Sequence, residues 1–514
     1  MKIFTATQIR QWDQYTIEHE PISSINLMER AGTVCFNFIK KQLLESRNTT
    51  NNPAAKPIKI FCGKGNNGGD GLAITQQLIH EGYEPQVYIL DSGNRGTENF
   101  EIYLSECFKI TDKIYFIRQE ADIPTIDRNE LIIDALFGTG LNKPIEGVAA
   151  SVVQKINESG ACIVSIDLPS GMYADNSSCD LVRIQPNYTL GFQHYKTCFL
   201  MAENAAAIGS LHLLDIGLHQ GFAINESTNL QLVDKEMIKA IYRPRNPFSH
   251  KGTFGHALIV AGSYGKMGAA ILSSNACLRS GVGLLTMQVP ETGYPIIQTA
   301  SPEAMAVNDL DVDFTKYHCI GAGPGLGTTK EANKRILTLI KYFGSKKAAK
   351  NKIADRCPLV LDADGLNILA GQPSLLQQLP KNTILTPHPK EFERLFGQSE
   401  NEFERMELAL KKATELNCYI ILKGHHSFIA CASGKGYFNN TGNAGMASAG
   451  SGDTLTGILT GLSAQGYSAL ESCLMGVYLH GLAGDIAADQ LSQEAMLASD
   501  IVQNLGGAFK CIQD

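Results

Sequence analysis

The feature that most constrains the fold is a repeated alternation of short β-branched runs with longer helical stretches. In the first part of the chain, strands are expected at 58–61, 87–90, 114–117, 131–135, 162–166 and 210–215. A second series is expected at 257–261, 284–289, 319–321, 359–362, 384–386 and 420–422. Strands that alternate with helices form parallel sheets, because each crossover needs a helix to bring the chain back to the same edge. The alternation therefore predicts an α/β protein.

A segment between the two series breaks this pattern. Residues 217–251 hold one short helical piece and the sequence Arg-Pro-Arg-Asn-Pro at 243–247. Proline fixes its own φ and restricts the residue before it, so this stretch suits a domain boundary. A chain of 514 residues is also long enough for more than one domain. We therefore expect two α/β domains, at residues 1–225 and 226–514. The polar stretch 47–57 is expected to be a loop that leads into the first strand.

The composition argues against several classes of protein. Lys and Arg number 44 against 51 Asp and Glu, the formal charge is −7, and no stretch is basic, so a nucleic-acid binder is not expected. No run approaches the ~18 apolar residues of a transmembrane helix, and the N-terminus lacks the apolar core of a secretory signal. The 13 cysteines are scattered without a Cys-x-x-Cys, which argues against a disulfide scaffold or a zinc ribbon. We expect a cytoplasmic protein that contacts neither nucleic acid nor membranes.

Glycine accounts for 49 residues, and one cluster of it follows the first expected strand. The stretch Gly63–Gly71 joins that strand to a helical sequence, and free N–H groups at a helix start form an anion site. The stretch also reads Gly-x-Gly-x-x-Gly, the dinucleotide fingerprint, with Asp91 close to the position of its ribose-binding acid. Asp70, however, is expected to open the helix, where it would repel a pyrophosphate. It could equally cap the helix.

Two later strands of the first series each end in an aspartate and a turn. Asp134 closes the fourth expected strand, and Asp167 follows the fifth. Because the carboxyl ends of parallel strands share one edge of a sheet, these loops are expected to meet the glycine loop there. Asn67, Asp134 and Ser170 then offer oxygen ligands for a hard cation. Asp167 remains as a carboxylate able to move a proton. Alternatively, each aspartate only caps the loop that follows it.

These loops resemble the YjeF N-terminal family, the NAD(P)H-hydrate epimerases, over residues 1 to about 220. The resemblance rests on the run 66–70, on the Asp134 loop and on the Asp-Leu-Pro-Ser-Gly turn at 167–171. It implies a Rossmann-like three-layer α/β/α domain that interconverts the R and S epimers of hydrated NADH or NADPH. It also implies potassium on Asn67, Asp134 and Ser170, and Asp167 as the acid and base that also contacts substrate. The implied substrate-binding residues are Asn66, Asn67, Gly68, Gly69, Asp70, Gly138, Thr139, Gly140, Leu141, Asn142, Lys143 and Pro144.

A second glycine-rich stretch, at 440–453, precedes an amphipathic helical sequence at 454–462. Backbone N–H groups of Gly450–Gly452 at a helix start can form an anion hole for a transferring phosphoryl group. Asp453 is then placed to take a proton from an attacking hydroxyl. The alternative is an aspartate cap behind a glycine turn. No Gly-x-x-x-x-Gly-Lys-Ser/Thr occurs in the chain, which argues against a P-loop nucleotide hydrolase.

Other loops of the second half follow expected strands in the same way. They are Gly321–Gly327, the Thr-Pro-His-Pro turn at 386–389 and Lys423–Ser427, and a small-residue helix is expected at 267–272. His388 lies between two prolines, which hold it at a strand end, so a ligand role and a structural role are both open.

The Thr-Pro-His-Pro turn and the Gly-Ser-Gly-Asp sequence at 450–453 resemble the YjeF C-terminal family over about 235–514. These are the NAD(P)H-hydrate dehydratases of the ribokinase-like superfamily. The resemblance implies a three-layer α/β/α domain in which ADP, with Mg²⁺, phosphorylates the C6 hydroxyl of the S epimer, and loss of phosphate restores NAD(P)H. Asp453 is implied as the base. The nucleotide is implied to contact Lys423, Gly424, His425, His426, Ser427 and Gly452, and the hydrated cofactor Ala269, Gly325, His388 and Asp453.

The two halves together predict one enzyme that repairs both epimers, with NADH hydrate, NADPH hydrate and ADP as small-molecule partners. A homo-oligomer is also expected. A small-alcohol kinase is an alternative, but it leaves the N-terminal half unexplained. A scaffold with degenerate sites is a second alternative, and the intact Asp167 and Asp453 argue against it. An NAD-dependent dehydrogenase rests only on the glycine loop and Asp91 and ranks last.

Overall fold

The computed structural model describes residues 1–45, 57–308, 312–343 and 359–513. The expected polar loop at 47–57 lies outside these residues apart from Pro57. The contacts within the chain divide it into two units. One comprises Lys2–Thr228 with Asn401–Phe403, and the other comprises Met1, Asn229–Glu400 and Glu404–Asp514. We call them the N-terminal unit and the C-terminal unit.

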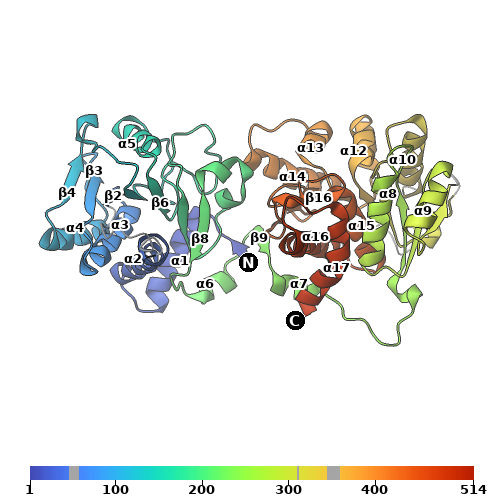
Figure 1. Cartoon of the computed structure of the whole chain (residues 1–514), viewed down its shortest axis with the longest axis horizontal. Helices are drawn as coiled ribbons and strands as arrows, with labels where there is room; N and C mark the ends of the chain where they lie inside the picture. Colours follow the sequence, from blue (N-terminus) through green and yellow to red (C-terminus); the bar gives the residue numbers. More distant parts are fainter. Residues whose placement is uncertain (46–56, 309–311, 344–358, 514) are drawn as a thin grey trace. The chain divides into compact units, whose positions relative to one another are not determined.

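The N-terminal unit is built on a parallel sheet (Figure 1). Its strands follow the order β4 (Ile114–Ile117), β3 (Gln86–Leu90), β2 (Ile58–Cys62), β5 (Leu131–Ala135), β6 (Cys162–Ile166), β7 (Tyr188–Phe192) and β8 (Ser210–Leu214). The chain adds strands on one side of β2 and then returns to the other side with β5. The loops after β2 and β5 therefore lead away in opposite directions, which opens a crevice at the carboxyl edge of the sheet.

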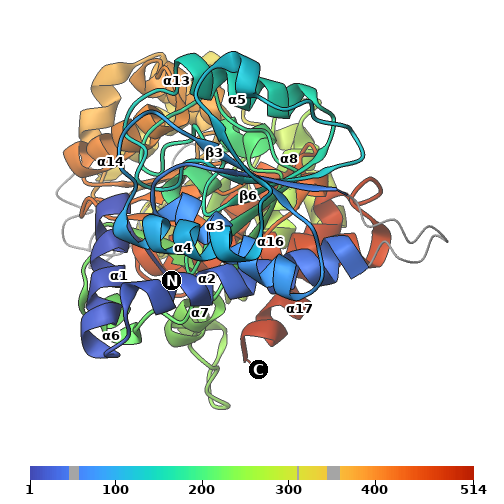
Figure 2. The ribbon, with the colours of Figure 1, turned by 90° about the vertical axis from the view of Figure 1, so that its left-hand side faces the viewer.

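Helices cover both faces of this sheet. Figure 2 shows α2 (Ser24–Ile39), α3 (Asn66–His80) and α4 (Glu98–Ile110) on one side of the strands and α5 (Gly147–Glu158) on the other. Alternation along β2 explains the two layers, since Ile58 and Ile60 pack toward α2, α3 and α4, whereas Phe61 belongs to the core that contains α5. Two further helices, α1 (Ala6–His19) and α6 (Gln220–Asn225), pack against each other around Trp12 and Phe222.

The C-terminal unit has a larger, mostly parallel sheet. Its order is β9 (Leu230–Val233), β18 (Gly436–Asn439), β17 (Phe428–Ala430), β16 (Tyr419–Leu422), β15 (Ile384–Leu385), β14 (Leu359–Leu361), β13 (Cys319–Ala322), β10 (His256–Val260), β11 (Leu284–Gln288) and β12 (Met305–Val307). Only β17 runs antiparallel to both of its neighbours within the described strands. The chain reverses between β10 and β13, so the loops after these strands also diverge at the carboxyl edge.

One face of the C-terminal sheet packs on α8 (Met267–Arg279), α15 (Ser451–Ala464) and α16 (Ala469–Leu491), and α17 (Ala498–Gln513) packs on these helices (Figure 1). α15 lies against β10, β13 and β14, which places its first turn at the carboxyl edge. The remaining helices are α7 (Lys235–Ile241), α9 (Tyr294–Ala300), α10 (Lys330–Phe343), α12 (Ala363–Ala370), α13 (Pro389–Phe396) and α14 (Glu402–Leu416).

The predicted two-domain α/β fold with parallel sheets is confirmed. Every expected strand is present, with each end within one residue of its prediction. β7, β9, β12, β17 and β18 were not expected, because they are short or, like β7, contain a glycine that weakens the strand pattern. Gly191 of β7 is explained by packing, since a Cβ there would lie 3.0 Å from the Phe199 ring.

The next two findings, on membrane-spanning helices and on disulfides, apply to the described residues. In residues 1–45, 57–308, 312–343 and 359–513, no helix combines the length and the apolar character needed to cross a bilayer. The cysteines of these same ranges are all free thiols.

The glycine loop after β2 leads to a first prediction, on stability. A Cβ on Gly68 would lie 1.7 Å from the Gly63 carbonyl oxygen, a backbone atom that cannot rotate away. Gly68→Ala should therefore lower the free energy of unfolding by at least about 1–3 kcal/mol, the usual cost of overpacking. The check is urea denaturation. Gly65→Ala in the same loop is the control, because a Cβ there meets nothing within 4 Å. Equal stability of the two variants would contradict the prediction.

Candidate functional sites

A cavity of about 640 Å³ lies in the N-terminal unit at the carboxyl edge of its sheet. Its lining includes the loops after β2, β5 and β6 and one side of α1. Of the predicted substrate-binding residues, the following line it: Asn66, Asn67, Asp70, Gly138, Thr139, Gly140, Leu141, Asn142 and Asp167. Gly68 and Gly69 are buried behind it, where a Cβ on Gly69 would meet Met28 at 2.5 Å. Lys143 and Pro144 are exposed and do not line it.

Two of the predicted cation ligands form one hydrogen-bonded group. Asp134 is fully buried at the end of β5, and its carboxylate accepts the Ser170 hydroxyl at 2.5 Å and the Ser170 N–H at 3.0 Å. Ser165 of β6 also donates its hydroxyl to Asp134, at 2.7 Å. Burial raises the pKa of Asp134, while these hydrogen bonds oppose the rise. No lysine or arginine forms an ion pair with Asp134 within the described ranges.

Asn67, the third predicted ligand, has unsatisfied polar atoms. Its Oδ1 and Nδ2 are both buried without a hydrogen-bond partner among the described residues. A buried amide without partners is costly unless something absent from the coordinates satisfies it. Asn67, Asp134 and Ser170 thus provide an orphaned amide oxygen, an unpaired carboxylate and a hydroxyl. This donor set fits a hard monovalent cation.

Asp167 has the most constrained backbone of this cavity. Its φ is +66°, in the left-handed region that few residues other than glycine adopt. Its Oδ1 lies 2.8 Å from Nζ of Lys196, and its Oδ2 accepts a hydrogen bond from the Thr139 N–H at 3.1 Å. Asp167 therefore has a fixed direction and a buried counter-charge. Lys196 is a functional candidate that could not be recognised in the sequence, because it belongs to no motif.

The structure changes the interpretation of two acids. α3 begins at Asn66 with Gly65 as its N-cap, so Asp70 neither opens nor caps the helix but lies one turn inside it. Burial and the negative charge of Asp167 raise the pKa of Asp70 well above its usual range. Asp91, the candidate ribose-binding acid, is ion-paired to Lys64 and to Arg118, and these partners lower its pKa. Asp91 is therefore already neutralised.

A second cavity, of about 680 Å³, lies in the C-terminal unit. It opens over the first turn of α15, whose N-cap is Gly450 with φ +93° and no side-chain cap. Asp453 lies in that first turn and is therefore not the helix cap. Burial and the nearby Asp362 raise the pKa of Asp453 to about 6, and Lys423 opposes the rise. A carboxylate with this pKa at a helix start can accept a proton near neutral pH.

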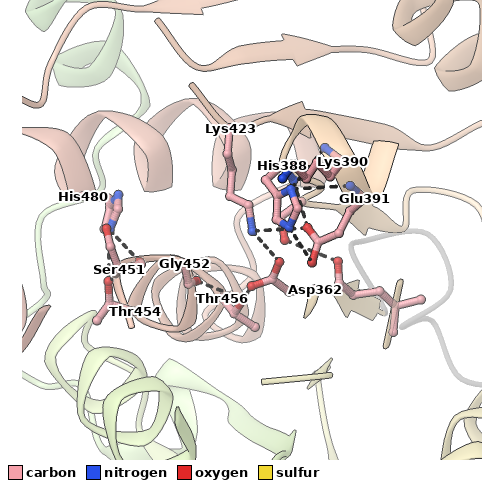
Figure 3. A network of polar contacts seen from close by, with 12 residues as sticks. Asp362, His388, Lys390, Glu391, Lys423, Ser451, Gly452, Thr454, Thr456 and His480 are labelled. Atoms are coloured by element: carbon pink, nitrogen blue, oxygen red, sulfur yellow. Dashed lines mark hydrogen bonds and ion pairs between the residues drawn. The ribbon is translucent and has the colours of Figure 1, made fainter. Parts of the chain in front are cut away.

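Asp362 and Lys423, which line the same cavity, belong to a polar network (Figure 3). Asp362, at the end of β14, accepts hydrogen bonds from Nζ of Lys423 at 2.7 Å and from Oγ1 of Thr456 at 2.8 Å. Burial alone would lower the pKa of Lys423, but Asp362, with smaller contributions from Glu391 and Asp453, more than compensates and raises it. Lys423 thus stays charged at the floor of the cavity. Asp362 was not singled out from the sequence, although its position after a strand was a usable signal.

Two histidines in this cavity play different parts. His388 caps α13, because its Nδ1 accepts the N–H groups of Lys390 and Glu391, at 3.2 and 3.4 Å. Its side chain is still 45% exposed and lines the cavity, so the capping role leaves it accessible to a ligand. His480 of α16 lies beside the start of α15, 3.0 Å from Oγ1 of Thr454 (Figure 3). Burial lowers the pKa of His480 to about 4, so it is neutral there.

The other predicted residues of this unit are divided between two places. Lys423, Gly424, His425, Ser427, Gly452, His388 and Asp453 line the cavity. Ala269 and Gly325 do not line it but adjoin each other, since a Cβ on Gly325 would lie 2.9 Å from that of Ala269. His426 also lies off the lining, and its Nδ1 is 3.2 Å from Nδ1 of His425.

The raised pKa of Asp453 leads to a second prediction, on pH. If Asp453 acts as a base it must be ionised, so activity of the C-terminal site should fall as the pH drops below about 6. Asp362→Asn removes a negative neighbour, which should lower the pKa of Asp453 and move this acidic limb to lower pH. The check is the pH profile of kcat/KM. Asp489→Asn, at an exposed position of α16, is the control. An acidic limb that moves upward in Asp362→Asn would contradict the prediction.

Comparisons with known proteins agree with this arrangement. A family model for the YjeF-related protein N-terminus matches residues 24–198, and one for NAD(P)H-hydrate dehydratase matches residues 257–506. Proteins named bifunctional NAD(P)H-hydrate repair enzyme Nnr match the chain almost end to end. The one from Moorella thermoacetica is 34% identical over 100% of this chain and 98% of its own length. The one from Thermofilum pendens is 32% identical over 100% and 97%.

One solved structure is also similar to part of the chain. It is the ADP/ATP-dependent NAD(P)H-hydrate dehydratase from Bacillus subtilis, co-crystallized with ATP/Mg²⁺. The match covers 56% of this chain and 100% of that one, with 30% identity and a TM-score of 0.47.

Proposed function

We propose, from the premise that this chain belongs to the bifunctional NAD(P)H-hydrate repair enzymes, that it repairs both epimers of hydrated NADH and NADPH. The N-terminal residues 1–225 interconvert the R and S forms. The C-terminal residues 226–514 convert the S form to NAD(P)H and use ADP as the phosphoryl donor. The observation that carries the proposal is the presence, in one chain, of two cavities that each hold a positioned aspartate, Asp167 in one and Asp453 in the other.

In the C-terminal cavity the chain's own residues support phosphoryl transfer. Asp453 takes the proton of the C6 hydroxyl as that oxygen attacks the terminal phosphoryl group of the nucleotide. The N–H groups at the start of α15, next to Gly452, face the charge that develops on the phosphoryl oxygens. Lys423, held charged by Asp362, adds a cation beside them. When bound, Mg²⁺ would offset the negative charge of the phosphates. Departure of the phosphate, with N1 supplying an electron pair, and loss of a proton from C5 then leave the C5–C6 double bond of NAD(P)H.

In the N-terminal cavity, Asn67, Asp134 and Ser170 hold potassium and Asp167 moves protons at the hydrated carbon. The orphaned amide of Asn67 supports the cation assignment. The bound cation would supply a fixed positive charge at the carboxyl edge of the sheet. Asp134 orients Ser170 through two hydrogen bonds, so the cation site and the loop that carries Asp167 are joined.

Each activity has its own assay. R and S hydrates are separated by chromatography, and the purified chain receives one epimer at a time. Without nucleotide, the R form should convert to an R and S mixture faster than it does spontaneously, and replacing K⁺ by a large organic cation should slow this. With ADP and Mg²⁺, the S form should yield NADH. If neither epimer changes with ADP or ATP, the proposal is wrong. ATP working in place of ADP would revise only the nucleotide.

A further inference from the structure

Charged side chains from four parts of the chain lie in the N-terminal cavity or directly against a residue that lines it. Asp13 reaches it from α1, Asp70 from α3 and Asp167 from the loop after β6. Lys196, from a segment beyond β7, pairs with Asp167 at 2.8 Å. Three carboxyl groups around one amine leave a surplus of negative charge if all are ionised. At least one carboxyl is therefore expected to hold a proton.

Lys196 and Asp167 form the charged half of this cluster. Lys196 is 1% exposed, and its Nζ lies 5.3 Å from the centre of the Phe199 ring. An ammonium buried this deeply needs an anionic partner, and Asp167 Oδ1 provides it. Asp167 Oδ2 accepts the Thr139 N–H and lines the cavity. Asp167 is thus an oriented carboxylate that can receive a proton.

Asp13 has the opposite environment. It lines the cavity half-buried, next to the buried Trp12, and makes no hydrogen bond or ion pair with the residues that the structure describes. Burial and the charge of Asp167 raise the pKa of Asp13 to about 7, although Lys196 opposes the rise. Near neutral pH a large share of Asp13 is therefore protonated. It is an acid with a free carboxyl group in the same cavity as Asp167, which is ion-paired to Lys196.

The other titratable groups of the cavity have different environments. Burial and the negative charge of Asp167 raise the pKa of Asp70 well above its usual range, and Asp70 lies one turn inside α3. Burial lowers the pKa of His194, whose Nδ1 is buried without a partner, so His194 stays neutral. The cations Arg10 and Lys64 also line the cavity, and Lys64 is already paired with Asp91.

Epimerisation at C6 moves a hydroxyl from one face of the ring to the other. The C6–O bond breaks as the ring nitrogen N1 supplies an electron pair, and the departing oxygen takes a proton to leave as water. Water then adds to the opposite face of the resulting C6=N1 iminium and gives up a proton. Such a sequence needs an acid and a base that exchange roles in the reverse direction.

We propose that Asp13 is the second catalytic residue of this site, giving the proton to the departing hydroxyl while Asp167 accepts one from the incoming water. Lys196 is a positioning residue, since it acts through Asp167. One forward turnover moves a single proton from Asp13 to Asp167, and the reverse turnover or solvent restores it. This inference rests on the proposed epimerase function of the N-terminal unit.

The test follows epimerisation without nucleotide, from a single epimer, by chromatography. Asp13→Asn should lower kcat by about 10²- to 10⁴-fold, the usual contribution of a general acid or base, and leave KM nearly unchanged. Glu18→Gln is the control, because Glu18 lies on the exposed side of the same helix. Lys196→Met should also lower kcat, and Lys196→Arg should restore part of it. ADP-dependent dehydration of the S form should be unchanged in every variant, and circular dichroism with thermal unfolding verifies that the N-terminal unit of each variant is folded.

Two readouts do not depend on a variant. In ¹⁸O-labelled water, the epimer formed should carry one ¹⁸O at C6, because its hydroxyl comes from solvent. The wild-type rate should also fall as the pH rises above about 7, where Asp13 loses its proton. If the wild type does not epimerise, the proposed function fails. If it does, an Asp13→Asn rate equal to that of Glu18→Gln, a product that keeps its original oxygen, or a rate that holds well above that pH overturns this inference alone.

Discussion

Asp453→Asn should lower the rate at which the S hydrate yields NADH with ADP by about 10²- to 10⁴-fold. Asparagine matches aspartate in size but cannot take the proton of the attacking hydroxyl. Asp453 lies in the first turn of α15, where burial and Asp362 raise its pKa to about 6. The nearby Lys423 keeps its own partner, Asp362, in the variant, so the rest of the network should remain in place. The measurement is NADH absorbance with saturating ADP and Mg²⁺.

Two controls accompany the rate measured for Asp453→Asn. Asp489→Asn, at an exposed position of α16, should leave the rate unchanged. Epimerisation by the Asp453→Asn protein should equal that of the wild type, because the residue belongs to the other unit. An Asp453→Asn protein that is folded and still forms NADH at a tenth of the wild-type rate or more would remove Asp453 from the role of base.

Asp167→Asn should have the reverse effect and lower the epimerisation rate by about 10²- to 10⁴-fold. The substitution removes the carboxylate that Lys196 and the Thr139 N–H hold in place. It also leaves Lys196 buried without a counter-charge, so a loss of stability is expected in addition. With a mixture of epimers, ADP and Mg²⁺, NADH formation should stop once the S form present at the start has been consumed.

The control for Asp167→Asn is Asp180→Asn, an exposed position in the same unit. It should epimerise like the wild type. Dehydration of the pure S form by the Asp167→Asn protein should also proceed at the wild-type rate. If Asp167→Asn is folded and the mixture still converts completely at the wild-type rate, Asp167 is not the acid and base of this site.

Much of the fold could be predicted because it depends on local periodicity. Buried parallel strands are short apolar runs, and each is followed by a helix, so β2, β5, β6 and their counterparts in the second half could be placed within one residue at each end. Strands without that signal were missed. β7 contains Gly191, which packing against Phe199 requires, and β12 and β17 are only three residues long.

The candidate sites could be predicted where a residue follows a strand, and not where it meets the site from elsewhere. Asp167 directly follows β6, and Asp453 follows the glycine-rich stretch that leads into α15, so both positions could be recognised in the sequence. Asp13 lies in the middle of a helix and Lys196 in an irregular segment. Their proximity to Asp167 arises from long-range packing, which no local pattern encodes. Asp70 shows a smaller error, because the helix start was expected one turn too late.

The central claim, that one chain repairs both epimers, is tested most directly by a single conversion. A mixture of R and S NADH hydrate is incubated with the intact protein, K⁺, Mg²⁺ and ADP, and NADH absorbance is followed to completion. If both sites are active, the amount of NADH should exceed the amount of S hydrate present at the start. It should reach the total amount of R and S hydrate faster than spontaneous epimerisation allows. A rise that stops at the initial S fraction, or continues only at the spontaneous rate, would contradict it.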